Sequence, residues 1–238
     1  MRIGLLGSEH PHRHSLSPMH ALRLLSDSIE PSHGESAFAA IGHANLARSP
    51  ANTPAVPSGV PRGITWSGRL GEGDEPFRAL PDAGNWTRAG WVTLIAACES
   101  LLPELRRRGV DLCLRPHARH ILSDAQGCLT LLRGNPDVRL LLDPGSMLAG
   151  SMLPRIEDHL TRIFEALGEH PAVAAVVLAN VRLLDPKDED ALILCPLHRG
   201  LIDPELLLRT WQAHCPPQLP CVLLEEEFEA QAAMLGQG

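Results

Sequence analysis

Several apolar segments of the sequence end in a side chain that could do chemistry. The clearest is VRLLLDPGSM at 138–147, where an apolar run stops at Asp143. A second run, VDLCLRPH, ends in Arg115 and His117. A carboxylate at the end of a buried strand needs a partner, because an unpaired charge is costly to remove from water. Further polar groups follow other apolar runs, namely His43, Asn180 and Glu225.

These residue types fit two kinds of site. Carboxylates and imidazoles are ligands of divalent ions, so Asp143, Glu225 and His43 are candidate metal ligands. In a metal-free site, Asp143 or Glu225 could act as a base, His117 as an acid and Arg115 as the stabiliser of an oxyanion. The candidate substrate-binding residues are His43, Trp66, Arg115, His120 and Asn180.

The elements that must position these side chains are clearest beyond residue 88. Apolar residues from Trp91 to Leu105 recur at helical spacing, and Gly109 follows, which predicts a helix of about 20 residues. Ser123 and Gln126 are typical of a capping box, and Asp203 with Pro204 of a helix start. We expect strands at 110–117, 138–145, 172–181 and 220–228, with helices at 124–134, 156–167 and 204–214.

The first 85 residues are less regular. We expect a strand at 2–7, a helix at 17–27 and a strand at 37–47. The segment 48–85 is rich in Pro, Gly and Ser, which favours a loop region, although 63–68 fits one short strand.

Regular alternation of strand and helix, with strands apolar on both faces, indicates a parallel sheet covered on both sides. Polar groups at successive strand ends favour a (β/α)8 TIM barrel over a doubly wound sheet, because in a barrel these ends share one mouth. We expect a single α/β domain over 1–238. Because the segment 48–85 lacks a regular strand–helix pattern, the N-terminal half of this barrel can be irregular or incomplete.

Composition excludes several partners. The net charge is -7, and no basic run exceeds Arg106 to Arg108, so we expect no nucleic acid and no anionic membrane as partner. No apolar stretch reaches the roughly 20 residues of a membrane span, so we expect a cytoplasmic protein. Six cysteines without a CxxC pair argue against a zinc knuckle. A homo-oligomer is left open.

The strand ends resemble those of the xylose-isomerase-like TIM barrels, a superfamily of sugar-phosphate isomerases and epimerases that includes endonuclease IV (AP endonuclease family 2) and dehydroshikimate dehydratases. GHANLARSP, with His43, is similar to the pattern H-A-x-x-N-L-A. LLLDPGSM, with Asp143, is similar to L-L-D-x-x-H, and VLLEEE supplies Glu225 on the last strand. The likeness covers roughly residues 88 to 230 well and 1 to 70 loosely.

Other positions depart from the family's metal site. Arg115 stands where the family has a metal-binding Glu, and Ser146 where it has a His. Trp66, Val177 and Asn180 replace further site residues. We therefore expect a degenerate metal site and no cofactor, with Zn, Mn or Mg binding doubtful, and we expect the Arg115 guanidinium to take the place of the metal beside Asp143, Glu225 or both.

Two functions follow from the resemblance. The first is a sugar or sugar-phosphate isomerase or epimerase that transfers a proton next to a carbonyl. The alternative is a non-catalytic relative, a pseudoenzyme that binds a small anionic sugar-like ligand or a protein partner.

Overall fold

The computed structural model describes residues 46–47, 61–71, 82–185, 187–224 and 226–235, and the backbone alone of 3–6, 23–25 and 39–40. Their strands form a large sheet and a separate hairpin. In spatial order, the strands of the large sheet are β3 (Ala39–Ala40), β4 (Arg62–Trp66), β5 (Asp111–Arg115), β6 (Val138–Leu142), β7 (Val173–Val177), β10 (Cys221–Leu224), β1 (Ile3–Leu6) and β2 (Arg23–Leu25).

The order of these strands is that of an α/β barrel. Neighbours from β3 through β10 to β1 are parallel, and β2 is antiparallel to β1. Because β1 pairs with β10, the strand near the start of the chain joins the last strand, as in a TIM barrel. Within the described part of the chain β2 and β3 end the sheet, so the described strands form an irregular, open barrel.

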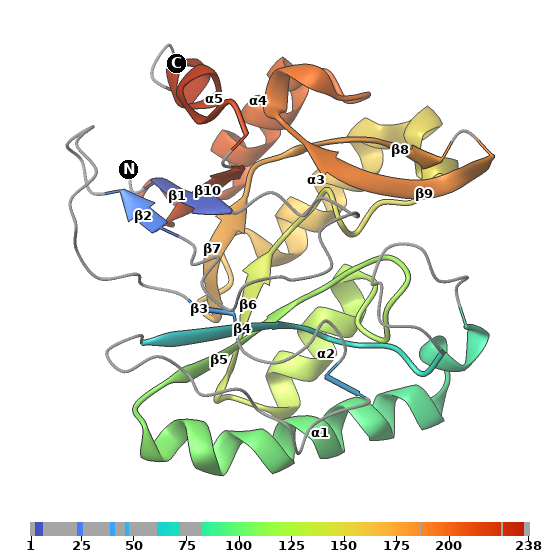
Figure 1. Cartoon of the computed structure of the whole chain (residues 1–238), viewed down its shortest axis with the longest axis vertical. Helices are drawn as coiled ribbons and strands as arrows, with labels where there is room; N and C mark the ends of the chain where they lie inside the picture. The colour runs from blue at the N-terminus through green and yellow to red at the C-terminus, as the bar shows by residue number, and fades with distance from the viewer. Residues whose placement is uncertain are drawn as a thin grey trace.

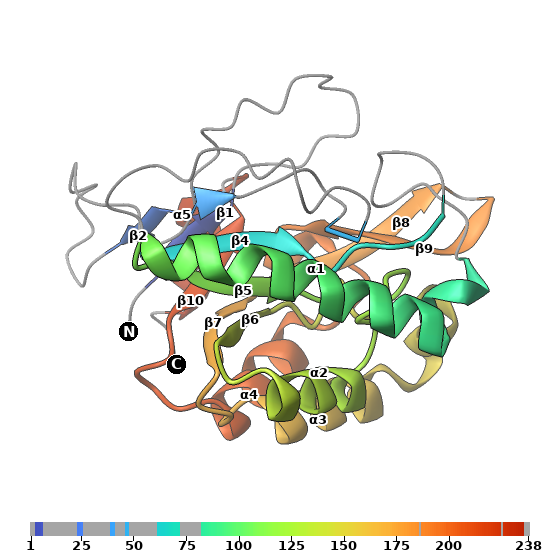
Figure 2. The same ribbon diagram turned by 90° about the horizontal axis from the view of Figure 1, so that it is seen from below.

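The helices follow each other around the outer side of the curved sheet (Figures 1 and 2). They are α1 (Arg88–Arg107), α2 (Ala125–Gly134), α3 (Ile156–Leu167), α4 (Pro204–His214) and α5 (Phe228–Leu235), with short 3-10 turns η1 (Ala83–Trp86), η2 (Gly150–Arg155) and η3 (Leu197–Arg199). No helix of the described residues has both the length and the hydropathy that crossing a bilayer requires.

Side chains alternate between the two faces of each strand, which divides the core into two layers. Leu112 and Leu114 of β5 pack outward against the helices. Cys113, between them, belongs to a smaller inner cluster. Other members of the inner cluster are Ile64, Leu141, Ala175 and Val222. One step further along this inner face, toward the carboxyl ends of the strands, come the predicted site residues.

Most predicted elements in the second half are confirmed, and two local predictions are wrong. Helix α4 begins after Asp203, whose side chain accepts a hydrogen bond from the Glu205 N–H at 3.0 Å, as expected. The cap of α2 is Asp124 rather than Ser123: the Asp124 carboxylate accepts from the Gly127 N–H at 2.8 Å.

In the first half, Arg23–Leu25 forms strand β2 and not the predicted helix, because it adds an antiparallel strand to the edge of β1. The rest of 17–27 lies outside the described residues. Segment 48–85 contains strand β4, as expected for 63–68, and most of η1. Residues 48–60 and 72–81 lie outside the described part.

The predicted strand 172–181 is two elements. Strand β7 ends at Val177, and β8 (Asn180–Asp185) then pairs with β9 (Asp188–Cys195) as an antiparallel hairpin, the two-stranded sheet of the molecule. At the far end of this hairpin, Asp185 pairs with Asp188. The sequence does not indicate the break after Val177, because Leu178 and Ala179 continue the apolar run.

Candidate functional site

The carboxyl ends of three neighbouring strands bring Trp66, Arg115 and Asp143 together at the barrel mouth. Trp66, the last residue of β4, is in register with Arg115, the last of β5. Asp143 directly follows β6, the next strand in the sheet. All three side chains are buried. The sheet therefore places these residues side by side although they are far apart in the sequence.

Arg115 and Asp143 form a buried ion pair, as predicted. The Arg115 Nε donates to Asp143 Oδ2 at 2.7 Å, and Arg115 Nη2 lies 2.7 Å from the same oxygen. The Asp143 side chain is completely buried and that of Arg115 is 5% exposed. In such surroundings, each charge stabilises the other, because neither has access to bulk water.

Ser146 completes the environment of Asp143. Its hydroxyl donates to Asp143 Oδ2 at 2.6 Å, and its backbone N–H donates to Oδ1 at 3.1 Å. Both carboxylate oxygens therefore accept hydrogen bonds from the protein. The site proposed below consequently does not use Asp143 as its base.

Two imidazoles and an indole surround the pair. The Arg115 Cζ lies 4.0 Å from the centroid of the Trp66 ring, a cation–π contact. His117 and His120 each meet Trp66 edge to face, at 5.5 Å between centroids, and lie 4.8 Å from each other. The structure thus brings together four predicted site residues, namely Trp66, Arg115, His117 and His120.

His117 is held as a neutral ring of defined tautomer. Its Nδ1 accepts a hydrogen bond from the Arg119 backbone N–H at 3.0 Å, which places the proton of the neutral ring on Nε2. Its pKa is lowered well below 6.5, mainly by burial and further by the charges of His120, Arg115, Arg119 and Arg69. His117 is therefore a hydrogen-bond donor through Nε2 at neutral pH, not a cation.

This lowered pKa predicts a pH-dependent stability. The unfolded chain binds a proton on His117 below pH 6.5 and the folded chain does not, so acidification favours unfolding. We expect the free energy of unfolding to fall as the pH drops below 6.5, by up to about 1.4 kcal/mol per pH unit from this group. Urea titrations between pH 7.5 and 5.5 measure the slope, which should be smaller in His117→Gln. The same slope in His117→Gln and in the control His214→Gln would contradict this assignment.

Three buried arginines in the described part of the chain, Arg69, Arg115 and Arg119, lie close enough to His117 to lower its pKa. Arg119 donates through Nη2 to both oxygens of Asp188, at 2.9 Å each. This contact is the main cause of a lowered pKa at Asp188. The imidazoles therefore lie in a positive environment that favours an anion.

Sequence reasoning missed Arg69, Arg119 and Asn85. Arg119 immediately precedes His120, so proximity to a predicted site residue was the available signal. Asn85 had no such signal: its amide donates to the Arg119 carbonyl at 3.0 Å and accepts from the Leu70 N–H at 2.7 Å. Asn85 thus ties the residues after β4 to those after β5.

The structure gives Asn180 a different setting from the one expected of a substrate ligand. Its amide nitrogen donates to the carbonyls of Leu197 and Ile202, both at 2.7 Å. Its oxygen accepts from the N–H groups of Val181 and Ile202, at 2.8 and 3.0 Å. These bonds use the hydrogen-bonding capacity of a fully buried amide. Asn180 therefore orders the 197–202 loop, and the proposed site is built without it.

Two predicted metal ligands, His43 and Glu225, lie outside the described residues. His43 is also a predicted substrate-binding residue, and Glu225 a predicted base. The chain after Glu225 is described. Glu227 has a positive φ of 54° and accepts from His198 at 2.6 Å and from Arg199. This turn between β10 and α5 is thus fixed to η3.

Among the described residues, the donor set around Asp143 does not fit a divalent ion. A metal ligand must offer a lone pair, and Asp143 Oδ2 already accepts from the Arg115 guanidinium and the Ser146 hydroxyl. A cation there would also face the fixed charge of Arg115. The described residues include no group of three or more His, Cys, Asp or Glu side chains that could hold a metal ion.

No model of a protein family matches the sequence, and no curated protein matches it. Several solved structures do match the structure of this chain. A xylose isomerase-like TIM barrel protein from Mycobacterium smegmatis, in complex with magnesium, has a TM-score of 0.46 and 14% identity over 75% of this chain and 61% of its own. The probable 3-DHS dehydratase AsbF from Bacillus anthracis has a TM-score of 0.47 and 10% identity over 75% and 62%.

A D-allulose 3-epimerase from Methylomonas sp., in complex with D-allulose, has a TM-score of 0.45 and 14% identity over 74% of this chain and 55% of its own. The chain therefore spans about three-fifths of the length of these structures. The first of them is a xylose isomerase-like TIM barrel, the kind of protein that the strand ends of this sequence resemble. Similarities this low say nothing of the activity of this chain.

Proposed function

We propose that the barrel mouth binds a small sugar-like anion, such as a sugar phosphate or sugar acid, without a metal ion. The observation that carries this proposal is the Arg115–Asp143 pair, which puts a guanidinium where the sequence resemblance places a metal-binding Glu. Arginine is suited to carboxylates and phosphates because its planar N–H groups match their oxygens.

The surroundings of the pair support the same ligand class. Trp66 offers an apolar ring face, and two imidazoles offer hydrogen bonds, the usual composition of small-molecule sites. The positive charges of Arg69, Arg115 and Arg119 favour an anion over a neutral sugar.

Calorimetric titration with ribose 5-phosphate, ribose and inorganic phosphate tests this proposal. We expect ribose 5-phosphate to bind more tightly than either part. The variant Arg115→Met/Asp143→Asn, which removes both buried charges together, should lose about 10- to 100-fold in affinity. Arg209→Met, which removes an exposed arginine of α4 paired with Glu157, is the matched control and should bind like the wild type. Equal affinity in both variants would overturn the role of Arg115.

A second candidate, proton transfer next to a carbonyl, is favoured by the tautomer of His117. In this reaction the base removes a proton from the carbon beside the carbonyl, His117 Nε2 donates to the oxygen that becomes negative, and the proton returns to carbon. The sequence predicts Asp143 or Glu225 as the base, and we assign this role to Glu225 because Asp143 is engaged by Arg115 and Ser146. Exchange of this carbon-bound proton with D2O, followed by NMR, should be measurable in wild type and lost in Glu225→Gln. Without exchange, the binding function remains and the enzymatic one is wrong.

A further inference from the structure

The hairpin β8–β9 is a two-stranded sheet separate from the barrel sheet. It leaves the sheet directly after β7, and in both ribbon views it lies at the end of the sheet where α1 begins (Figures 1 and 2). Since α1 follows β4, this is the end to which the carboxyl ends of the parallel strands point. The hairpin therefore belongs to the mouth and not to the opposite face of the barrel.

An ion pair joins the hairpin to the chain after β5. Arg119 Nη2 lies 2.9 Å from each oxygen of Asp188, the first residue of β9. The arginine side chain is 9% exposed and the carboxylate 38% exposed. Asp188 Oδ1 also accepts from the Ala191 N–H at 3.1 Å, which fixes the carboxylate on its own strand.

A second set of contacts joins the hairpin to the chain after β6. The Ser151 N–H donates to Asp190 Oδ1 at 2.8 Å. Gly150 packs so closely that a Cβ there would lie 1.6 Å from the Glu189 carbonyl oxygen. At the root of the hairpin, a Cβ on Gly145 would lie 2.8 Å from the Leu194 side chain. The hairpin, which follows β7, thus contacts the segments that follow β5 and β6.

The ion pair is also directly connected to the imidazoles of the proposed site. Arg119 stands between His117 and His120, and its backbone N–H donates to His117 Nδ1. His117 is 5% exposed and His120 is completely buried. Movement of Arg119 with the hairpin would therefore change access to both rings.

We propose that β8–β9 is a strap across the barrel mouth, latched by the Arg119–Asp188 pair, and that release of this latch opens the way to His117 and His120. The role of the strap in admitting a ligand rests on the proposed anion site. The existence of the strap does not rest on that site, because the latch is closed in the protein without ligand.

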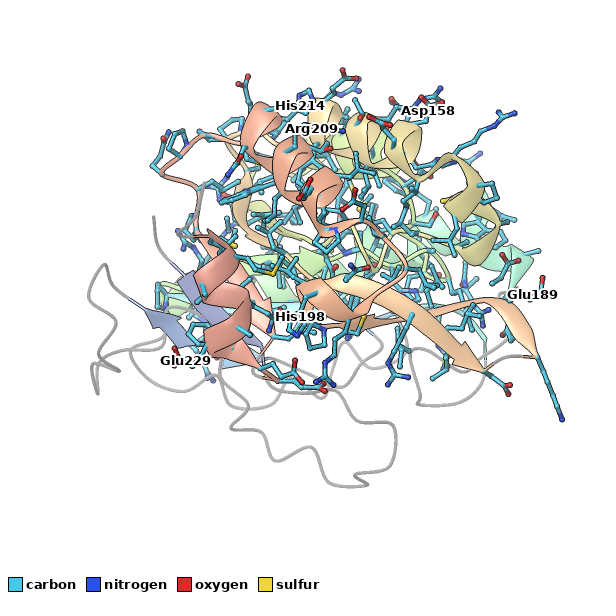
Figure 3. All side chains as sticks on the ribbon, turned by 90° about the horizontal axis from the view of Figure 1, so that it is seen from above. Asp158, Glu189, His198, Arg209, His214 and Glu229 are labelled. Carbon is cyan, nitrogen blue, oxygen red and sulfur yellow. The ribbon has the colours of Figure 1, made fainter. Side chains whose placement is uncertain are left out.

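A test without ligand measures access to the imidazoles. Diethyl pyrocarbonate modifies accessible imidazole nitrogens, and peptide mass spectrometry gives the rate at each histidine. In Asp188→Asn we expect the modification of His117 and His120 to be about fivefold faster than in wild type, because the neutral amide holds Arg119 less strongly. His214 on α4, outside the hairpin and labelled in Figure 3, serves as an internal standard whose rate should not change.

Hydrogen exchange on the same variant tests the strap directly, since local opening exposes backbone amides. Protection should fall over 181–195 and stay unchanged in α3 and α4. The matched control is Glu157→Gln, which breaks the exposed pair with Arg209 on α4, far from Glu189 at the hairpin (Figure 3). A second variant, Gly150→Ala, should displace the hairpin by steric contact with Glu189 and produce the same two changes without altering any charge.

Unchanged exchange over 181–195 in both hairpin variants would overturn the strap. Faster exchange without faster modification of His117 and His120 would overturn its control of access. Ribose 5-phosphate should associate about fivefold faster with Asp188→Asn than with wild type if the strap admits the ligand. If the strap opens but no sugar anion binds, the proposed function is wrong and the strap is still established.

Discussion

Replacing Arg115 by Met should lower the free energy of unfolding by about 3–5 kcal/mol. The reason is the charge left behind: Asp143 is completely buried and accepts Arg115 Nε at 2.7 Å, so without the guanidinium its negative charge keeps only the Ser146 hydrogen bonds. Chemical denaturation followed by tryptophan fluorescence or circular dichroism measures this loss. A loss below about 1 kcal/mol, the size typical of an exposed ion pair, would contradict this expectation.

The double variant Arg115→Met/Asp143→Asn separates charge from packing. Removing both charges should restore most of the lost stability, because the buried carboxylate is then neutral. The exposed pair between Arg209 and Glu157 offers the comparison: Arg209→Met should change stability by less than about 1 kcal/mol. A double variant as unstable as Arg115→Met would mean that the arginine stabilises the barrel through its packing on Trp66 and not through Asp143.

The second large effect is expected at Asn180. Asn180→Ala should destabilise the protein by about 2–4 kcal/mol, because it leaves the buried backbone groups of Leu197 and Ile202 without their hydrogen bonds. Thermal or urea unfolding measures the loss. Asn180→Asp, which keeps the size of the side chain but cannot donate to two carbonyls, should be similarly harmful.

Affinity measurements on Asn180→Ala show whether this residue is structural. At temperatures below its unfolding midpoint, the variant should bind ribose 5-phosphate with an affinity within about threefold of that of the wild type, since no step of the proposed recognition uses Asn180. A strong loss of binding with unchanged stability would restore the prediction that Asn180 contacts the substrate.

The elements of the second half could be predicted because each is specified locally. The helix around Trp91 and Leu94 has a helical period in its own sequence, and β6 is an unbroken apolar run that ends at Asp143. Once parallel neighbours are expected, polar groups at their carboxyl ends must lie close together. This is why the contact between Arg115 and Asp143 could be predicted across 28 positions.

The hairpin and its latch could not be predicted in the same way. Arg119 and Asp188 are 69 positions apart, and their contact depends on how β8–β9 leans over the loops after β5 and β6, which no local pattern records. Strand β8 begins with Asn180. The sequence predicts this residue as a strand-end ligand because the preceding apolar run continues through Leu178 and Ala179. Tertiary hydrogen bonds decide the role of this residue.

The cap of α2 shows a smaller limit of the same kind. Ser123 and Asp124 are both good N-cap residues, and the sequence favoured Ser123 because Gln126 follows at capping-box spacing. In the folded chain Asp124 is the cap, since its carboxylate reaches the Gly127 N–H. Local patterns predict that a helix begins here but not which of two adjacent residues caps it.

Titration calorimetry of the chelator-treated protein with ribose 5-phosphate, before and after addition of magnesium or manganese, tests the central claim most directly. The Arg115–Asp143 pair predicts binding in the presence of chelator and a dissociation constant that added metal changes by less than about twofold. Binding that appears only after metal is added, together with one equivalent of metal in the complex, would contradict the account.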